Sequence, residues 1–122
     1  MTLHNKILIA DDDAEMLETL SSMLEGEGYQ VVRAENGEEA VELAQKELPA
    51  LIMLDIHMPR MDGLSACRAL KTAAVTKAIP VVMLTVEGSI TEIQQAINYG
   101  AKTYITKPSS REEILKVIKS VL

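Results

Sequence analysis

Residues 51–63 read LIMLDIHMPRMDG, an uninterrupted apolar run that ends in a single aspartate and continues into a loop. A parallel strand covered by helices on both faces is apolar at successive positions, because neither face meets water. Similar runs occur at residues 7–10 and 81–84. We therefore predict three buried parallel strands, the second of which ends at Asp55.

Helical patterns separate these strands. In the first, apolar residues recur at helical spacing from Met16 to Leu24, and further helical patterns lie near residues 37–47, 63–72, 89–98 and 110–121. Two further runs, around residues 30–34 and 103–106, include polar residues, which is typical of edge strands. Strands that alternate with helices indicate βα units with right-handed crossovers. We predict an α/β fold, a doubly wound, flavodoxin-like five-stranded parallel sheet in the order 2-1-3-4-5.

Length and composition restrict the function classes. A chain of 122 residues suffices for one domain of ordinary size. The net charge of −6, the absence of Trp and Phe, and the lack of a basic stripe argue against direct nucleic-acid binding. No apolar run reaches the ~20 residues of a membrane span. No secretory signal is visible and Cys67 is the single cysteine, so a cytoplasmic location is expected.

Polar side chains follow the predicted strands where each strand ends. Asp11 and Asp12 follow the first strand, Asp55 ends the third, Thr85 the fourth, and Lys107 follows the fifth. Ligand sites in such sheets lie outside the carboxyl ends of the strands. Clustered carboxylates repel one another unless a cation intervenes, and oxygen ligands suit Mg²⁺. Since a hydroxyl and an ammonium suit a phosphoryl group, Asp55 is the candidate nucleophile for an aspartyl phosphate.

These residues resemble the receiver domains of two-component response regulators, and the resemblance covers about residues 5–121. It implies a single receiver domain over residues 1–122, with its core at about residues 5–121 and no output domain in this chain. The motifs occur in the family's order: Asp11-Asp12, LDIHMPRMDG at residues 54–63, Thr85, Tyr104 and Lys107-Pro108. The resemblance implies that Asp55 is the phosphoacceptor. It also implies that Asp11, Asp12, Asp55 and the backbone carbonyl of His57 hold Mg²⁺.

Further roles follow from the same resemblance. Thr85 and Lys107 would bind the phosphoryl group, and Thr85 and Tyr104 would form a conformational switch. The loops beside the site would be shaped by Pro59, Gly63 and Pro108. A sensor histidine kinase or a phosphotransfer protein would supply the phosphoryl group. A homodimer through the face of residues 89–121 is a further expectation. The domain would assist its own phosphorylation and dephosphorylation without being a turnover enzyme.

Three alternatives remain open on the sequence alone. Asp11-x-Asp13 after an apolar strand imitates the opening motif of haloacid-dehalogenase-type phosphatases, but only Glu112 and Glu113 follow Lys107 as possible metal ligands. A flavodoxin-like flavin carrier would need a phosphate-binding loop where the three aspartates lie. A degenerate receiver could serve as a scaffold, although the acidic residues, Thr85 and Lys107 are all present.

Several residues have simpler structural interpretations. Asp13 is a predicted helix N-cap rather than a metal ligand, and Asp62 is predicted to be a cap or turn residue before Gly63. The His57 side chain is predicted to face solvent, and Cys67 to be a buried apolar residue. Leu17 is either part of the core rim or a docking contact.

Overall fold

The computed structural model describes residues 5–86, 89–107 and 109–122, in which strands and helices alternate. The strands are β1 (Lys6–Ala10), β2 (Gln30–Ala34), β3 (Leu51–Asp55), β4 (Val81–Val86) and β5 (Thr103–Lys107). The helices are α1 (Ala14–Gly26), α2 (Gly37–Glu47), α3 (Gly63–Thr72), α4 (Ile90–Asn98) and α5 (Arg111–Val121). Among the described residues, no helix is long and apolar enough to cross a membrane.

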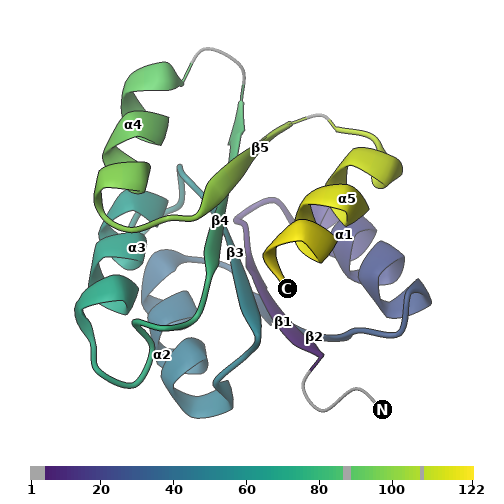
Figure 1. Cartoon of the computed structure of the whole chain (residues 1–122), viewed down its shortest axis with the longest axis horizontal. Coiled ribbons are helices and arrows are strands. Elements are labelled where there is room, and N and C mark those ends of the chain that lie inside the picture. Colours follow the sequence, from purple (N-terminus) through teal and green to yellow (C-terminus); the bar gives the residue numbers. More distant parts are fainter. Residues whose placement is uncertain (1–4, 87–88, 108) are drawn as a thin grey trace.

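The five strands form one parallel sheet in the order β2-β1-β3-β4-β5. This confirms the predicted fold class and strand order. Helices α1 and α5 cover one face of the sheet, while α2, α3 and α4 cover the other (Figure 1). Since β1 and β3 are neighbours in the sheet and their connections leave toward opposite edges, the switch point lies between them.

The sheet separates two apolar cores. Alternate residues of each central strand face opposite sides. In β3, Ile52 and Leu54 pack toward α2, α3 and α4, whereas Leu51 and Met53 pack toward α1 and α5. All five residues of β3 are buried. The central position of β3 explains its continuous apolar sequence, and it places Asp55 where a rigid strand ends.

Side chains satisfy the free N–H groups at the start of four helices. Asp13 caps α1 and Asp62 caps α3, as predicted; Asn36 caps α2 in the same way. Ser110 and Glu113 form a reciprocal capping box at α5. Such a cap stabilises a helix by about 1 kcal/mol, so these four starting points are well defined.

The strands β4 and β5 extend further than the sequence indicated. The ladder between them continues through Thr85–Thr106 to Val86–Lys107, so Lys107 lies within β5 rather than after it, and Thr85 is followed by one more strand residue. Backbone pairing drives this extension, because each additional pair satisfies polar groups regardless of the side chain. Pro108, predicted to shape the following loop, lies outside the described residues.

Two glycines allow close approaches beside the loop after β3. A Cβ on Gly63 would lie 2.1 Å from the backbone oxygen of Asp55, and the Gly63 N–H donates to the carbonyl of Ile56 at 2.7 Å. A Cβ on Gly37 would lie 2.1 Å from the backbone oxygen of Met61. The sequence indicates a loop-shaping role for Gly63, whereas no pattern in it points to Gly37. Both glycines let the loop fold tightly against α2 and α3.

Candidate functional site

Three carboxylates meet at the carboxyl edge of the sheet. Asp11 follows β1, Asp12 is the next residue, and Asp55 ends the adjacent β3. One oxygen from each of these side chains lies within 4.8 Å of the others. Asp11 is fully buried and Asp55 is 8% exposed, while Asp12 is exposed. The predicted acidic cluster is therefore assembled, with one side open to solvent.

Lys107 reaches this cluster from β5, the outermost strand on one side of the sheet. Its Nζ donates a hydrogen bond to Oδ2 of Asp11 at 2.8 Å and lies 3.4 Å from Oδ1 of Asp55. The Asp11 carboxylate also accepts a hydrogen bond from the backbone N–H of Asp13 at 3.0 Å. The ammonium lies between two acids and brings a single positive charge to a pocket of three carboxylates.

The excess of negative charge, together with burial, changes the pKa of the Asp55 carboxyl. Burial and the neighbouring charge of Asp11 raise the pKa of Asp55 to about 6, although Lys107 opposes the rise. Burial alone would lower the pKa of the Lys107 ammonium, but its hydrogen bond to Asp11 and the charge of Asp55 raise it on balance. A divalent cation among the three oxygens would relieve the repulsion, so the residues fit a hard metal ion.

The two predicted switch residues lie on neighbouring strands. Thr85 is 2% exposed, and its Oγ1 donates a hydrogen bond to the backbone oxygen of Val86 at 3.2 Å. Tyr104, which is opposite Met83 in the β4–β5 register, is 43% exposed. The hydroxyl is therefore near the end of β4 with a weak internal partner, and the ring is turned toward solvent.

His57 lies in the loop after β3, with its side chain 67% exposed as predicted. Its Nε2 lies 3.2 Å from each carboxylate oxygen of Glu92, in the first turn of α4. An open cleft lined by Asp12, His57, Met58, Pro59 and Asp62 adjoins the acidic cluster. No sequence pattern indicates the Glu92 contact, because it joins two segments 35 residues apart.

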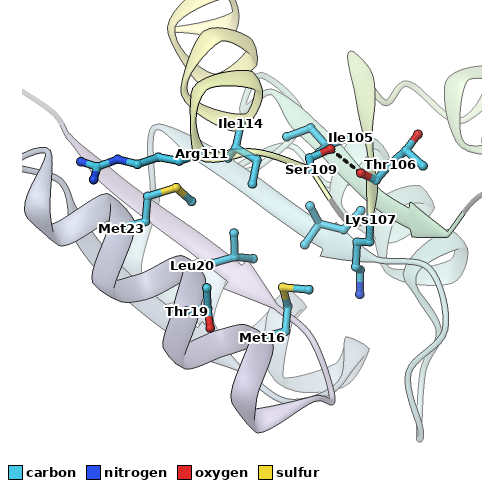
Figure 2. A pocket seen from close by; sticks show the side chains of 11 residues that line it. Met16, Thr19, Leu20, Met23, Ile105, Thr106, Lys107, Ser109, Arg111 and Ile114 are labelled. Atoms are coloured by element: carbon cyan, nitrogen blue, oxygen red, sulfur yellow. Dashed lines mark hydrogen bonds between the residues drawn. The ribbon is translucent and has the colours of Figure 1, made fainter.

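An apolar groove of about 410 Å³ lies between α1 and α5, next to Lys107. Met16, Leu20 and Met23 of α1 point toward Ile105 and Ile114 on the far side (Figure 2). Lys107 belongs both to the wall of this groove and to the acidic cluster. Leu17, in contrast, is buried in the core beneath α1, which settles its predicted alternatives in favour of packing.

The fold and the site define a class: a flavodoxin-like α/β protein with carboxylates and a lysine at the switch point. Comparison with known proteins identifies the family. The response regulator receiver domain family matches residues 7–119, and the chain belongs to this family.

Individual relatives agree. PilH of Pseudomonas aeruginosa is 42% identical over 117 residues, covering 96% of this chain and 97% of PilH. The alkaline phosphatase synthesis transcriptional regulatory protein PhoP of Bacillus subtilis is 35% identical over 120 residues, and the match covers 98% of this chain but 49% of PhoP. Several similar curated proteins, such as the ycf27 and MprA regulators, are like PhoP about twice as long as the matched region. The structure of chemotaxis response regulator CheY4 of Vibrio cholerae superimposes with a TM-score of 0.92 at 33% identity, covering 98% of this chain and all of CheY4.

These findings settle the class of function. The chain is a phosphoacceptor receiver domain of two-component signalling, and such domains are regulatory proteins. The family membership does not favour the haloacid-dehalogenase, flavin-carrier or scaffold alternatives.

Proposed function

We propose that Asp55 accepts a phosphoryl group from the phosphohistidine of a sensor histidine kinase or phosphotransfer protein. One observation carries the proposal: a nearly buried carboxylate at the end of the central strand, 3.4 Å from a lysine and beside two further carboxylates. With a pKa of about 6, the Asp55 side chain is ionised at neutral pH and can act as a nucleophile.

The reaction forms one bond and breaks another. An oxygen of the Asp55 carboxylate attacks phosphorus in line, the P–N bond to the donor histidine breaks, and the electron pair remains on the imidazole. Asp11, Asp12, Asp55 and the backbone carbonyl of His57 would hold Mg²⁺, which when bound offsets charge on the phosphoryl oxygens. Lys107 already points into the site and would donate to the same oxygens. Thr85 would exchange its bond to Val86 for one to the phosphoryl group.

The groove between α1 and α5 is the proposed docking site for the donor helix. An amphipathic helix binds by placing apolar residues in such a groove. Because Lys107 borders both the groove and the acidic cluster, a donor seated there would present its phosphohistidine to Asp55. Met16→Glu should slow phosphorylation by the cognate donor and leave labelling by acetyl phosphate unchanged. Equal slowing with both donors would overturn this docking site.

The proposal also includes a conformational switch that connects Asp55 to the surface of residues 89–121. Movement of Thr85 toward the phosphoryl group opens space into which the Tyr104 ring turns, coupling the site to the surface of residues 89–121. That surface would pair with a second copy of the chain. Pro59 and Pro108 would shape the flanking loops with Gly63. The proposed receiver domain is cytoplasmic, does not bind nucleic acid directly, and does not turn over substrates as an enzyme.

Labelling with acetyl phosphate and Mg²⁺ tests the phosphoacceptor. Intact-mass measurement should show one added phosphoryl group per chain, and Asp55→Asn should show none. Asp62→Asn is the matched control, since the same substitution there removes an exposed acid and keeps a side chain able to cap α3. Labelling of Asp55→Asn at the wild-type rate would refute the assignment. Sustained hydrolysis of an aryl phosphate would instead identify a phosphatase.

A further inference from the structure

A side-chain contact joins the proposed metal-binding loop to helix α4. His57 Nε2 lies 3.2 Å from both oxygens of the Glu92 carboxylate. An ionised carboxylate only accepts hydrogen bonds, so Nε2 carries the proton and donates it. The His57 ring therefore contacts α4, while the His57 backbone belongs to the loop that flanks the acidic cluster.

Helix α4 is lightly held in comparison with its neighbours. Ala96 is its one fully buried residue within the described chain. Ile90, at its first position, is 77% exposed, and the preceding Ser89 makes no side-chain cap hydrogen bond in the described structure. A helix with so little burial opens locally at small free-energy cost. One polar contact therefore has a large relative influence on the position of its first turn.

On the other side of the contact, the loop adjoins the metal-binding cluster. His57 and Asp12 line the same open cleft, and Asp55 lies two residues before His57. Gly63 and Ile56 close the inner part of this loop through a backbone hydrogen bond. The outer part, at His57, is exposed, and the Glu92 carboxylate contacts it from another element.

From this arrangement we infer that Glu92 is a positioning residue for the magnesium site. Glu92 holds the His57 side chain, and thereby keeps the His57 carbonyl in the place from which it completes the ligand set. The inference rests on the proposed magnesium site formed with Asp11, Asp12 and Asp55. Holding the loop before the ion binds reduces the ordering that binding requires, so the contact raises the affinity for Mg²⁺.

The coupling is reciprocal by thermodynamic linkage. If the Glu92 contact raises the affinity for Mg²⁺ by a given factor, then Mg²⁺ favours the formed contact over the broken one by the same factor. Occupation of the metal site therefore stabilises the first turn of α4. This route reaches α4 through the loop after β3, and it does not involve Thr85 or Tyr104.

Four variants separate the contact from general effects of charge. Glu92→Ala removes both the acceptor and the charge, and alanine maintains helix propensity. Glu92→Gln removes the charge and retains an acceptor oxygen for His57. Glu42→Ala, on the exposed face of α2, removes one acidic charge elsewhere. His57→Ala removes the contact from the loop side without altering α4 and guards against a helix effect of Glu92→Ala.

Two measurements are made on each variant: the dissociation constant of Mg²⁺ by titration of backbone amide signals, and hydrogen exchange in residues 90–98. A hydrogen bond between two partly exposed side chains predicts a change of about 2- to 5-fold. We expect Glu92→Ala and His57→Ala to bind Mg²⁺ more weakly by this factor, and Glu92→Gln and Glu42→Ala to remain near wild type. Mg²⁺ should slow exchange at the start of α4 in the wild type and lose this effect in Glu92→Ala.

The outcomes are distinct. Equal Mg²⁺ affinity in the wild type, Glu92→Ala and His57→Ala would overturn the role of Glu92 while leaving the magnesium site intact. An equal loss in Glu42→Ala would also overturn it, because long-range charge would then explain the effect. If Asp12→Ala binds Mg²⁺ as the wild type does, the proposed magnesium site itself is wrong, and this inference falls with it.

Discussion

Helices α3 and α4 lie next to each other on one face of the sheet, yet they are held very differently (Figure 1). Helix α3 starts at the Asp62 cap and buries Gly63 and three side chains: Ala66, Cys67 and Leu70. Within the described residues, α4 starts without a side-chain cap and fully buries Ala96 alone. Arg68 of α3 lies 5.5 Å from the centre of the Tyr99 ring, at the end of α4, and so joins the two helices there.

This difference corresponds to different tasks. Helix α3 follows the loop that begins at Asp55, so its firm packing fixes one end of the candidate phosphorylation loop. Helix α4 follows β4, which carries Thr85, and its light packing allows it to move with little loss of buried area. Elements that change position in regulation come from the less stable parts of a fold. The proposed phosphorylation of Asp55 can therefore alter α4 while α3 remains in place.

The largest expected difference between the two helices is in the free energy of unfolding after truncation of one aliphatic side chain in each. Leu70 of α3 is fully buried, so Leu70→Ala should lower the free energy of unfolding by about 2–5 kcal/mol. Ile90 of α4 is 77% exposed, so Ile90→Ala should change it by less than about 0.5 kcal/mol. Urea unfolding measures both. Comparable losses in the two variants would show that α4 is packed as firmly as α3.

The next effect comes from the close approach of Gly63 to the phosphorylation loop. A methyl group there would overlap the backbone oxygen of Asp55, so Gly63→Ala should destabilise the protein by roughly 1–3 kcal/mol and displace Asp55. A methyl group on Gly26, at the end of α1, would meet no atom of the described residues within 4 Å, so Gly26→Ala should be neutral or stabilising. Urea unfolding and acetyl phosphate labelling would check both variants. Unchanged labelling of Gly63→Ala would contradict the proposed tight loop.

A third prediction concerns the charge of the Asp55 carboxylate, which lies before the loop that leads to α3. Because folding raises the pKa of Asp55 from 3.8 to about 6, the folded state holds this proton more tightly than the unfolded state does. Without divalent cations, this contribution to stability is present below pH ~4 and is lost as the pH rises toward and beyond pH ~6. Asp55→Asn should therefore be more stable than the wild type at pH 7.5, by roughly 1–3 kcal/mol. Urea unfolding at pH 4.5 and 7.5 measures this difference.

Asp62→Asn provides the control for that experiment, since it removes an exposed acid at the start of α3 and keeps a capping side chain. Its dependence on pH should follow that of the wild type. If Asp55→Asn shows no gain in stability at pH 7.5, the carboxylate cluster does not oppose folding, and the argument for a relieving cation is weakened.

The sequence predicted the sheet because the relevant information is local. The apolar runs of β1, β3 and β4 identify strands buried on both faces, and the parallel alternation then limits the strand order. Asp11, Asp55 and Lys107 could be placed together because the carboxyl ends of parallel strands share one edge. Asp13 and Asp62 could be recognised as caps because their partners lie within three residues.

Contacts between distant segments could not be predicted in the same way. The approach of Gly37 to Met61 and the contact of His57 with Glu92 depend on how two loops and helices pack, and neither leaves a periodic pattern. The state of Lys107 was also incompletely predicted. Lys107 binds Asp11 and approaches Asp55, because buried carboxylates attract the nearest ammonium.

The smallest expected change in stability distinguishes the N-cap residues of the two helices, Asp62 before α3 and Ser89 before α4. The Asp62 carboxylate accepts a hydrogen bond from the backbone N–H of Ser65 at 2.8 Å, so Asp62→Ala should lower the free energy of unfolding by about 1 kcal/mol. Ser89 makes no such bond within the described structure, and Ser89→Ala should change stability by a few tenths of a kcal/mol at most. Ser89→Asp is the informative third variant, because a carboxylate at this position can accept from the first turn of α4 and interacts favourably with the helix dipole. It should slow hydrogen exchange in residues 90–93 and leave α3 unchanged. If α4 were already held as firmly as α3, an added cap would have little effect on its exchange, and the contrast between the two helices would disappear.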